Sequence, residues 1–180
     1  VEVDANGNLF IADFGNGRIR AVYAGGAQVA ALIAATNGGE VAQPGDIYTV
    51  VGGGSSYYTP GAVVLATSIS LGAPGVGGAA ATLGSLRKIA LDSRGNLYIA
   101  DNGNNAILFV DGTTGYLRAI AGSVSAAATP GAGCPAQTDA FGDNCPATLA
   151  TLNPNNAMGV GADSLGNIYI ADSGNARVRE

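Results

Sequence analysis

The sequence predicts an all-β fold built from repeated hairpins, and two observations support this prediction. First, three segments align residue by residue, and they read VEVDANGNLFIADFGNGRIR from Val1, IALDSRGNLYIADNGNNAIL from Ile89 and VGADSLGNIYIADSGNARVR from Val160. Each contains an Asp, two variable residues, Gly-Asn and an apolar run that ends in Ile-Ala-Asp. Second, the chain has 29 glycines and 47% hydrophobic residues but only 12% charged residues, where about 25% is usual. This composition is typical of buried strands joined by tight turns, or of a surface partly covered by copies of itself.

Each segment is expected to form a β-hairpin. The aspartate after the first strand can accept hydrogen bonds from turn amides, and the glycine three residues later supplies a positive φ without steric cost. These pairs are Asp4 and Gly7, Asp92 and Gly95, and Asp163 and Gly166. The second strands are apolar at every position, which predicts that both of their faces are buried. They run from Leu9 to Ala12, from Leu97 to Ala100 and from Ile168 to Ala171.

A third and a fourth strand complete the repeat. Third strands are expected at Arg18 to Tyr23, at Ile107 to Val110 and from Arg177 onward. In the first two units a fourth strand is expected, because Ile47-Tyr48-Thr49-Val50-Val51-Gly52 aligns with Leu117-Arg118-Ala119-Ile120-Ala121-Gly122. Four short antiparallel strands per repeat are typical of a β-propeller blade. The chain is predicted to be a single propeller segment, with units at about 1–54, 62–123 and 147–180.

The circle of blades is expected to be incomplete. A propeller closes with roughly four to eight blades, whereas this sequence holds two near-complete units and a third that stops partway through its third strand at Glu180. Two interpretations remain open. Either these residues are a window on a longer polypeptide, or separate copies join and complete each other's blades.

The repeat resembles a known family. The pattern D-x-x-G-N-[LI]-[YF]-I-A-D is followed by an asparagine, at Asn16, Asn104 or Asn175, and then by an arginine and an apolar residue, at Arg18-Ile19 or Arg177-Val178. This pattern is similar to the NHL repeat, and Ala106 departs from it where the other units carry arginine. Two segments resemble the inter-blade linkers of the bacterial, secreted branch, namely Ala66 to Leu71 and Pro146 to Leu152. The resemblance implies an NHL-type β-propeller in an exported bacterial protein.

Three long connections enlarge the units and are expected to be loops. They are Ala24 to Gly45, Gly53 to Leu86 and Ser123 to Asn144. Insertions on one face of a propeller often form its binding face, and Gly- and Ala-rich spacers without a role are the alternative. Aromatic residues in these connections are the candidate binding residues, namely Tyr57, Tyr58 and Phe141.

The two cysteines, Cys134 and Cys145, are predicted to form a disulfide. They lie eleven positions apart in a segment rich in Pro, Gly and Asp, and the sequence has no histidine. A zinc site is therefore a poor match, and a redox pair lacks the C-x-x-C spacing. A disulfide indicates an oxidising compartment, so we expect an extracellular or periplasmic location.

Several activities are not supported by the residues present. Without histidine the chain lacks the commonest general base and metal ligand, so we expect no enzyme, cofactor or metal in this segment. The EF-hand match at Asp4-Ala5-Asn6-Gly7-Asn8 fails because its twelfth position is Gly15. Asp13, Asp101 and Asp172 are interpreted as turn residues. A net charge of −5 with eight scattered basic residues argues against nucleic-acid binding. The sequence has no run of about 18 consecutive apolar residues, so we expect no transmembrane helix in it.

Three functional hypotheses follow. The first is a non-catalytic extracellular propeller that binds a protein or a glycan through its loops. The second is a structural protein that assembles with copies of itself into filaments or surface layers. The third is an enzyme whose catalytic residues lie outside this segment.

Overall fold

The computed structural model describes residues 1–56, 58, 61–69, 86–122, 134, 138–153 and 158–180. The described chain is mostly β, with three antiparallel sheets and one short helix, which confirms the predicted all-β class. The first sheet has the order β1-β2-β3-β4, formed by Glu2–Val3, Leu9–Asp13, Arg18–Val22 and Ile47–Gly52. The third has the order β10-β11-β12, formed by Met158–Ala162, Ile168–Asp172 and Arg177–Arg179.

The second sheet has five strands in the order β5-β9-β8-β7-β6. Strands β6 (Leu86–Leu91), β7 (Leu97–Asp101), β8 (Ala106–Val110) and β9 (Tyr116–Ala121) follow the four-strand pattern of the first sheet. The fifth strand, β5 (Val64–Leu65), comes from the connection that precedes the unit and pairs with the outer side of β9. The predicted fourth strands are therefore present in both units as β4 and β9.

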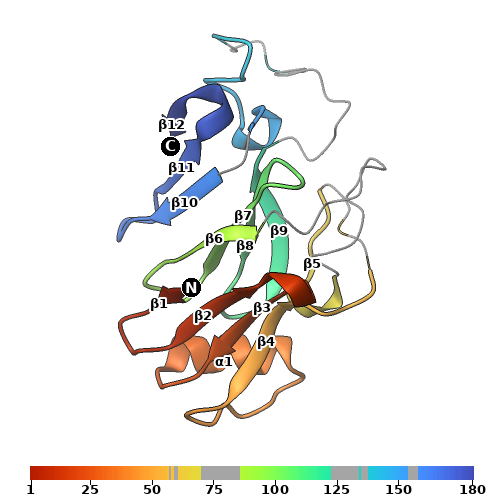
Figure 1. The fold of residues 1–180 in the computed structure, drawn as a ribbon, viewed down its shortest axis with the longest axis vertical. Coiled ribbons are helices and arrows are strands. Elements are labelled where there is room, and N and C mark those ends of the chain that lie inside the picture. The colour runs from red at the N-terminus through yellow and green to blue at the C-terminus, as the bar shows by residue number, and fades with distance from the viewer. Residues whose placement is uncertain (57, 59–60, 70–85, 123–133, 135–137, 154–157) are drawn as a thin grey trace.

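The three sheets follow one another along the molecule and pack face to face (Figure 1). One core lies between the first and second sheets, where the β2 side faces β6, and it contains Phe10, Ile19, Leu97, Ile99, Leu108, Val110 and Leu117. A second core lies between the second and third sheets, where β10 packs against β6 and β7, and it contains Tyr98, Ala100, Ile107, Met158, Val160 and Ile170. The second sheet is thus covered on both of its faces.

The hairpin turns form as the sequence predicts. Their glycines have positive φ values of 83° at Gly7, 82° at Gly95 and 94° at Gly166. In each turn the Asp Oδ1 atom accepts hydrogen bonds from the amides two and four residues later, at 2.9 to 3.0 Å. The asparagine after each glycine donates its side-chain amide to the same carboxylate. The turn is therefore fixed by side chains within five residues of one another.

The second turn of each unit also joins an aspartate to an asparagine three residues later. Asp13 accepts from Asn16, Asp101 from Asn104 and Asp172 from Asn175, each through the asparagine Nδ2 atom. In the first and third units this turn is a short 3₁₀ helix, η1 (Phe14–Asn16) and η4 (Ser173–Asn175). These carboxylates therefore accept hydrogen bonds mainly from asparagine side chains in the turns. Asp101 also accepts one from a backbone N–H group of its turn, that of Asn104, at 3.3 Å.

The prediction that all second strands are buried on both faces is right for β7 and wrong for β2 and β11. Every residue of β7 is buried, whereas Leu9 in β2 is 37% exposed and Tyr169 in β11 is 40% exposed. The physical reason is position, because the second sheet has a packed neighbour on each side. The first and third sheets are each packed against one sheet of the described chain.

The sequence predicts a loop from Ala24 to Gly45, but this connection contains a helix, α1 (Ala27–Thr36). Its buried residues follow helical spacing, at Val29, Leu32, Ile33 and Thr36, and they pack beside β4. Asn37 fixes the end of the helix, because its backbone N–H donates to Ile33 O at 2.9 Å and its Nδ2 atom to Thr49 O at 3.1 Å. The insertion is therefore an ordered part of the first core.

Much of the other two long connections lies outside the described residues, including 70–85 and 123–133. Two described pieces of linker form short 3₁₀ helices, η2 (Ala66–Ser68) and η3 (Ala147–Leu149), which pack against β4 and β9. None of the helices within the described ranges has the length and apolar character needed to cross a membrane.

Candidate functional site

The second sheet shows how a fourth strand is held in this protein. Strand β9 lies between β8 and β5: Leu108 pairs with Ala119 on one side, and Val64 pairs with Leu117 on the other. The linker that supplies β5 continues into η2. A strand in this place therefore has a partner on each edge.

The third unit contains the same flanking parts around a cleft. Strand β12 corresponds to β8, and Cys145-Pro146 before η3 corresponds to Val64-Leu65 before η2. In the described part of the chain, β12 pairs with β11 on one side and with no strand on the other. A cleft of about 910 Å³ opens there. Its lining includes four consecutive residues, 177–180, so it runs along the edge of β12.

The cleft has an apolar floor and a polar rim. Apolar side chains come from the end of β9, the linker and β11, namely Ile120, Ala121, Ala150, Leu152, Ile168 and Ile170. Polar side chains come from β12 and the segment before the linker, including Arg177, Arg179, Asp143 and Asn144. The arrangement can take an extended chain whose backbone pairs with β12 and whose apolar side chains contact the floor.

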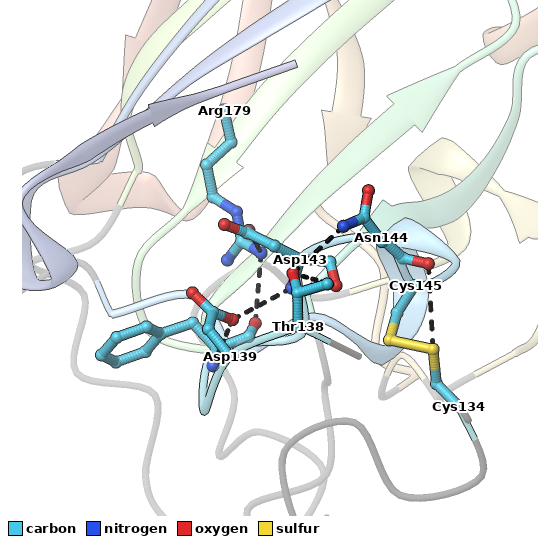
Figure 2. Close-up of a disulfide and its surroundings, with 8 residues drawn as sticks. Cys134, Thr138, Asp139, Asp143, Asn144, Cys145 and Arg179 are labelled. Carbon is cyan, nitrogen blue, oxygen red and sulfur yellow. Dashed lines mark hydrogen bonds and ion pairs between the residues drawn. A yellow bond between two sulfur atoms is a disulfide. The ribbon is translucent and has the colours of Figure 1, made fainter. Parts of the chain in front are cut away.

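An ion-pair network joins the segment before the linker to β12, and Figure 2 shows Arg179, Asp143 and Asp139 of this network. Arg179 Nη2 lies 2.5 Å from Asp143 Oδ1, and Arg177 Nη1 lies 2.7 Å from Asp143 Oδ2 and also contacts Asp139. Arg179 Nη1 reaches the fully buried Asp172 at 3.4 Å. Two arginines thus hold the segment around Asp139 and Asp143 against the third sheet.

The network and the local turn determine the ionisation of Asp139. Desolvation acts to raise the pKa of Asp139, but backbone N–H groups of Asp143 and Phe141 and the Arg177 guanidinium together lower it to about 2. The same contact with Asp139 raises the pKa of Arg177. Charge-assisted hydrogen bonds of this kind favour the ionised forms of both partners.

The predicted disulfide between Cys134 and Cys145 is present, with Cα atoms 5.8 Å apart (Figure 2). It closes the segment that contains Asp139 and Asp143, and Cys145 itself lines the cleft. A disulfide that closes a loop restricts the unfolded chain and stabilises the fold. It fits a protein that matures in an oxidising compartment.

The structure separates the three aromatic candidates. Tyr57 lies outside the described residues. Tyr58 is 9% exposed, and its hydroxyl accepts from Ala119 N at 2.8 Å and donates to Ala62 O at 3.3 Å. Burial raises the pKa of Tyr58, and the hydrogen bond from the Ala119 N–H opposes that shift. Its side chain is therefore part of the second sheet's packing, and a role in ligand binding stays a prediction.

Phe141 lies beside the cleft network. The Arg177 guanidinium carbon sits 4.6 Å from the centre of the Phe141 ring, a cation–π contact. The Phe141 carbonyl accepts a hydrogen bond from Arg179 Nη2 at 3.1 Å. Phe141 thus contacts two arginines that line the cleft without lining it itself, whereas Tyr58 packs in the second sheet.

Sequence reasoning missed the two arginines and their acidic partners. A signal was present, because Arg177 and Arg179 repeat the Arg18 and Arg20 of the first unit, and Asp139 and Asp143 lie close to Cys145. The contact between these arginines and aspartates depends on the path of the linker, which cannot be read from their spacing in the sequence. Among the described residues no three His, Cys, Asp or Glu side chains gather as a metal site would need.

Comparison with protein-family models and with curated proteins found no match. The resemblance to NHL repeats therefore rests on the three aligned hairpins and their linkers.

Proposed function

We propose that this chain is an NHL-type β-propeller segment of an exported protein, and that it works as a non-catalytic binding scaffold. Its ligand is an extended protein segment that lies in the cleft beside β12. Three repeated hairpins stacked face to face support the propeller, and the disulfide supports export. The single observation that carries the binding role is the cleft of about 910 Å³ along the open edge of β12.

The open edge favours a peptide backbone over a glycan as ligand. A strand at the edge of a sheet presents N–H and C=O groups that pair with another extended chain, and apolar pockets for alternate side chains then give specificity. In this cleft the edge and the apolar floor lie together. The arginines of the rim already contact Asp139, Asp143 and Asp172, so an uncharged ligand face fits best.

The protein's own fourth strands indicate the ligand sequence. In β9, Leu117 is fully buried and Ala119 packs against the first core. A ligand strand in the equivalent place would direct its matching residues toward Ile120 and Leu152. We therefore expect a segment of about six residues in which apolar side chains alternate with side chains that face away from the floor, the pattern of a half-buried strand.

The test uses a synthetic peptide of residues 115–122, Gly-Tyr-Leu-Arg-Ala-Ile-Ala-Gly, labelled with fluorescein. We expect saturable binding to the protein by fluorescence anisotropy, with amide chemical-shift changes on β12. A scrambled peptide and one with N-methylated alternate amides are expected to bind weakly, since methylation removes backbone donors without altering the protein.

A matched pair of protein variants locates the site. Ile120→Lys places a charge on the cleft floor and is expected to weaken peptide binding at least tenfold, since a buried unpaired charge is costly. Tyr116→Lys adds the same charge on the same strand at a residue that is 50% exposed and outside the cleft lining, and it should bind like the wild type. The proposal fails if peptide affinity is unchanged both by N-methylation of the peptide and by Ile120→Lys. It also fails if the protein binds a glycan and no peptide.

A further inference from the structure

The apolar faces of the repeat alternate in a fixed order. In each second strand the first and third residues form one face, here named the leading face, and the second and fourth form the trailing face. The first core joins the trailing residue Phe10 to the leading residues Leu97 and Ile99. The second core joins the trailing residues Tyr98 and Ala100 to the leading residue Ile170. Both internal interfaces are therefore of one kind, with a trailing face against the next leading face.

The leading face of the first sheet carries an open apolar row. Cross-strand pairing places Val3, Leu9, Val22 and Ile47 side by side. The equivalent row of the second sheet is Leu91, Leu97, Val110 and Leu117, and it belongs to the first core. Leu9 is 37% exposed where Leu97 is fully buried, and Ile47 is 43% exposed where Leu117 is fully buried.

The trailing face of the third sheet is open in the same way. Tyr169 is 40% exposed, whereas its equivalent Tyr98 is 6% exposed. Val178 pairs with Ala171 on this face and is 76% exposed, whereas its equivalent Ile107 is fully buried. Within the described residues, one leading face and one trailing face are thus open, and these are the two kinds of face that meet in the internal interfaces.

We propose that the open trailing face of the third sheet packs against the open leading face of the first sheet of a second copy. A second copy is the partner proposed because both interfaces inside the chain already join a trailing face to a leading face through the same positions of the repeat. Charge is also complementary. The leading face carries Arg18 beside the Arg20–Asp13 ion pair, and Glu180 lies two residues after Val178 and acts electrostatically on Tyr169 of the trailing face.

Such contacts join two different surfaces, so they are heterologous. Repetition of a heterologous contact gives a ring if the rotation closes and a filament if it does not. The trailing face shares Val178 and Glu180 with the lining of the peptide cleft, but the two substituted positions used below, Leu9 and Ala171, lie outside that lining. Substitutions at Leu9 and Ala171 therefore test self-association without altering the cleft lining, so the two proposals can fail separately.

Sedimentation velocity of the full chain over a range of concentrations tests the proposal. We expect the wild type to associate as its concentration rises. Leu9→Glu blocks the leading face and Ala171→Glu blocks the trailing face, and each variant alone is expected to stay monomeric. Both positions are exposed, and circular dichroism checks that the variants keep the fold. Leu165→Glu is the control, because Leu165 is 83% exposed in a hairpin turn and outside both faces.

Mixing the two blocked variants gives the sharpest outcome. The mixture retains one intact leading face and one intact trailing face, so it should form dimers and nothing larger. A two-fold contact between like faces predicts no such rescue. The proposal is overturned if the wild type is monomeric at every concentration, if either single variant associates like the wild type, or if the mixture stays monomeric.

Discussion

The second sheet and the two sheets beside it have nearly the same sequence pattern and quite different surroundings. Leu9 and Leu97 occupy the same position of the repeat, yet one is 37% exposed and the other is fully buried. Their hairpin turns are alike, because Asn8 N and Asn96 N donate to the preceding aspartate at 2.9 and 3.0 Å. Local turn chemistry is thus a property of each repeat, whereas burial is a property of its neighbours.

This difference implies that stability is concentrated in the second sheet. A repeat unit with an apolar leading and an apolar trailing face cannot cover both by itself, and stacking supplies the missing contact. The second sheet has this contact on both sides within the described chain. Equivalent substitutions should therefore have unequal effects in the second sheet and in its neighbours.

The largest effect is expected for Leu97→Ala compared with Leu9→Ala. Truncation of a fully buried leucine to alanine costs about 2–5 kcal/mol, because the lost transfer free energy adds to the cost of the cavity that is left. Leu9→Ala should cost about 1 kcal/mol or less, because much of the side chain already contacts water. Urea unfolding at a concentration low enough to keep the chain monomeric measures both. Equal costs would show that burial does not differ between the two sheets.

The hairpins and fourth strands were predictable because their signals are local. Asp92, Gly95 and Asn96 lie within one turn, and no distant residue is needed to fix their geometry. Burial could not be predicted in the same way. All three units share an apolar run that ends in Ile-Ala-Asp, but only stacking decides which faces of the run meet a neighbour.

Helix α1 and the cleft show two other limits. The buried helix residues recur at Val29, Leu32, Ile33 and Thr36, which is helical spacing, but flanking alanines make the run apolar throughout and hide its period. Cys134 and Cys145 could be paired from spacing and composition. The cleft beside Cys145 could not be predicted, because it depends on how the linker places this residue beside β12.

A smaller effect is expected for Gly95→Ala compared with Gly166→Ala. Both glycines have positive φ, which costs an alanine about 1–2 kcal/mol. An added Cβ at Gly95 would also lie 2.7 Å from the Cβ atom of Gln28 in α1, whereas nothing lies within 4 Å at Gly166. Thermal unfolding should show the lower midpoint for Gly95→Ala. Equal midpoints would mean that α1 moves aside at no cost.

The smallest effect concerns pH and two aspartates in different surroundings. Burial raises the pKa of Asp101 above 3.8, although hydrogen bonds from Asn104 oppose the shift. Asp101 therefore lowers stability as pH rises from 3.8 through its raised pKa, because the folded state resists ionisation. Hydrogen bonds from the Asn167 side chain and backbone lower the pKa of Asp163 below 3.8. Asp163 thus contributes stability above 3.8 that is lost as pH falls through its lowered pKa.

Asp101→Asn and Asp163→Asn should consequently respond to pH with opposite signs. The stability of Asp101→Asn relative to the wild type should rise between about pH 3 and about pH 7, since the variant has no charge to bury. The relative stability of Asp163→Asn should fall over the same interval, since the variant lacks the carboxylate that the turn amides favour. Urea midpoints of the three proteins at matched pH measure both differences and cancel the other titrating groups. Parallel pH profiles for the two variants would show that the buried turn of the second sheet and the exposed turn of the third hold their carboxylates alike.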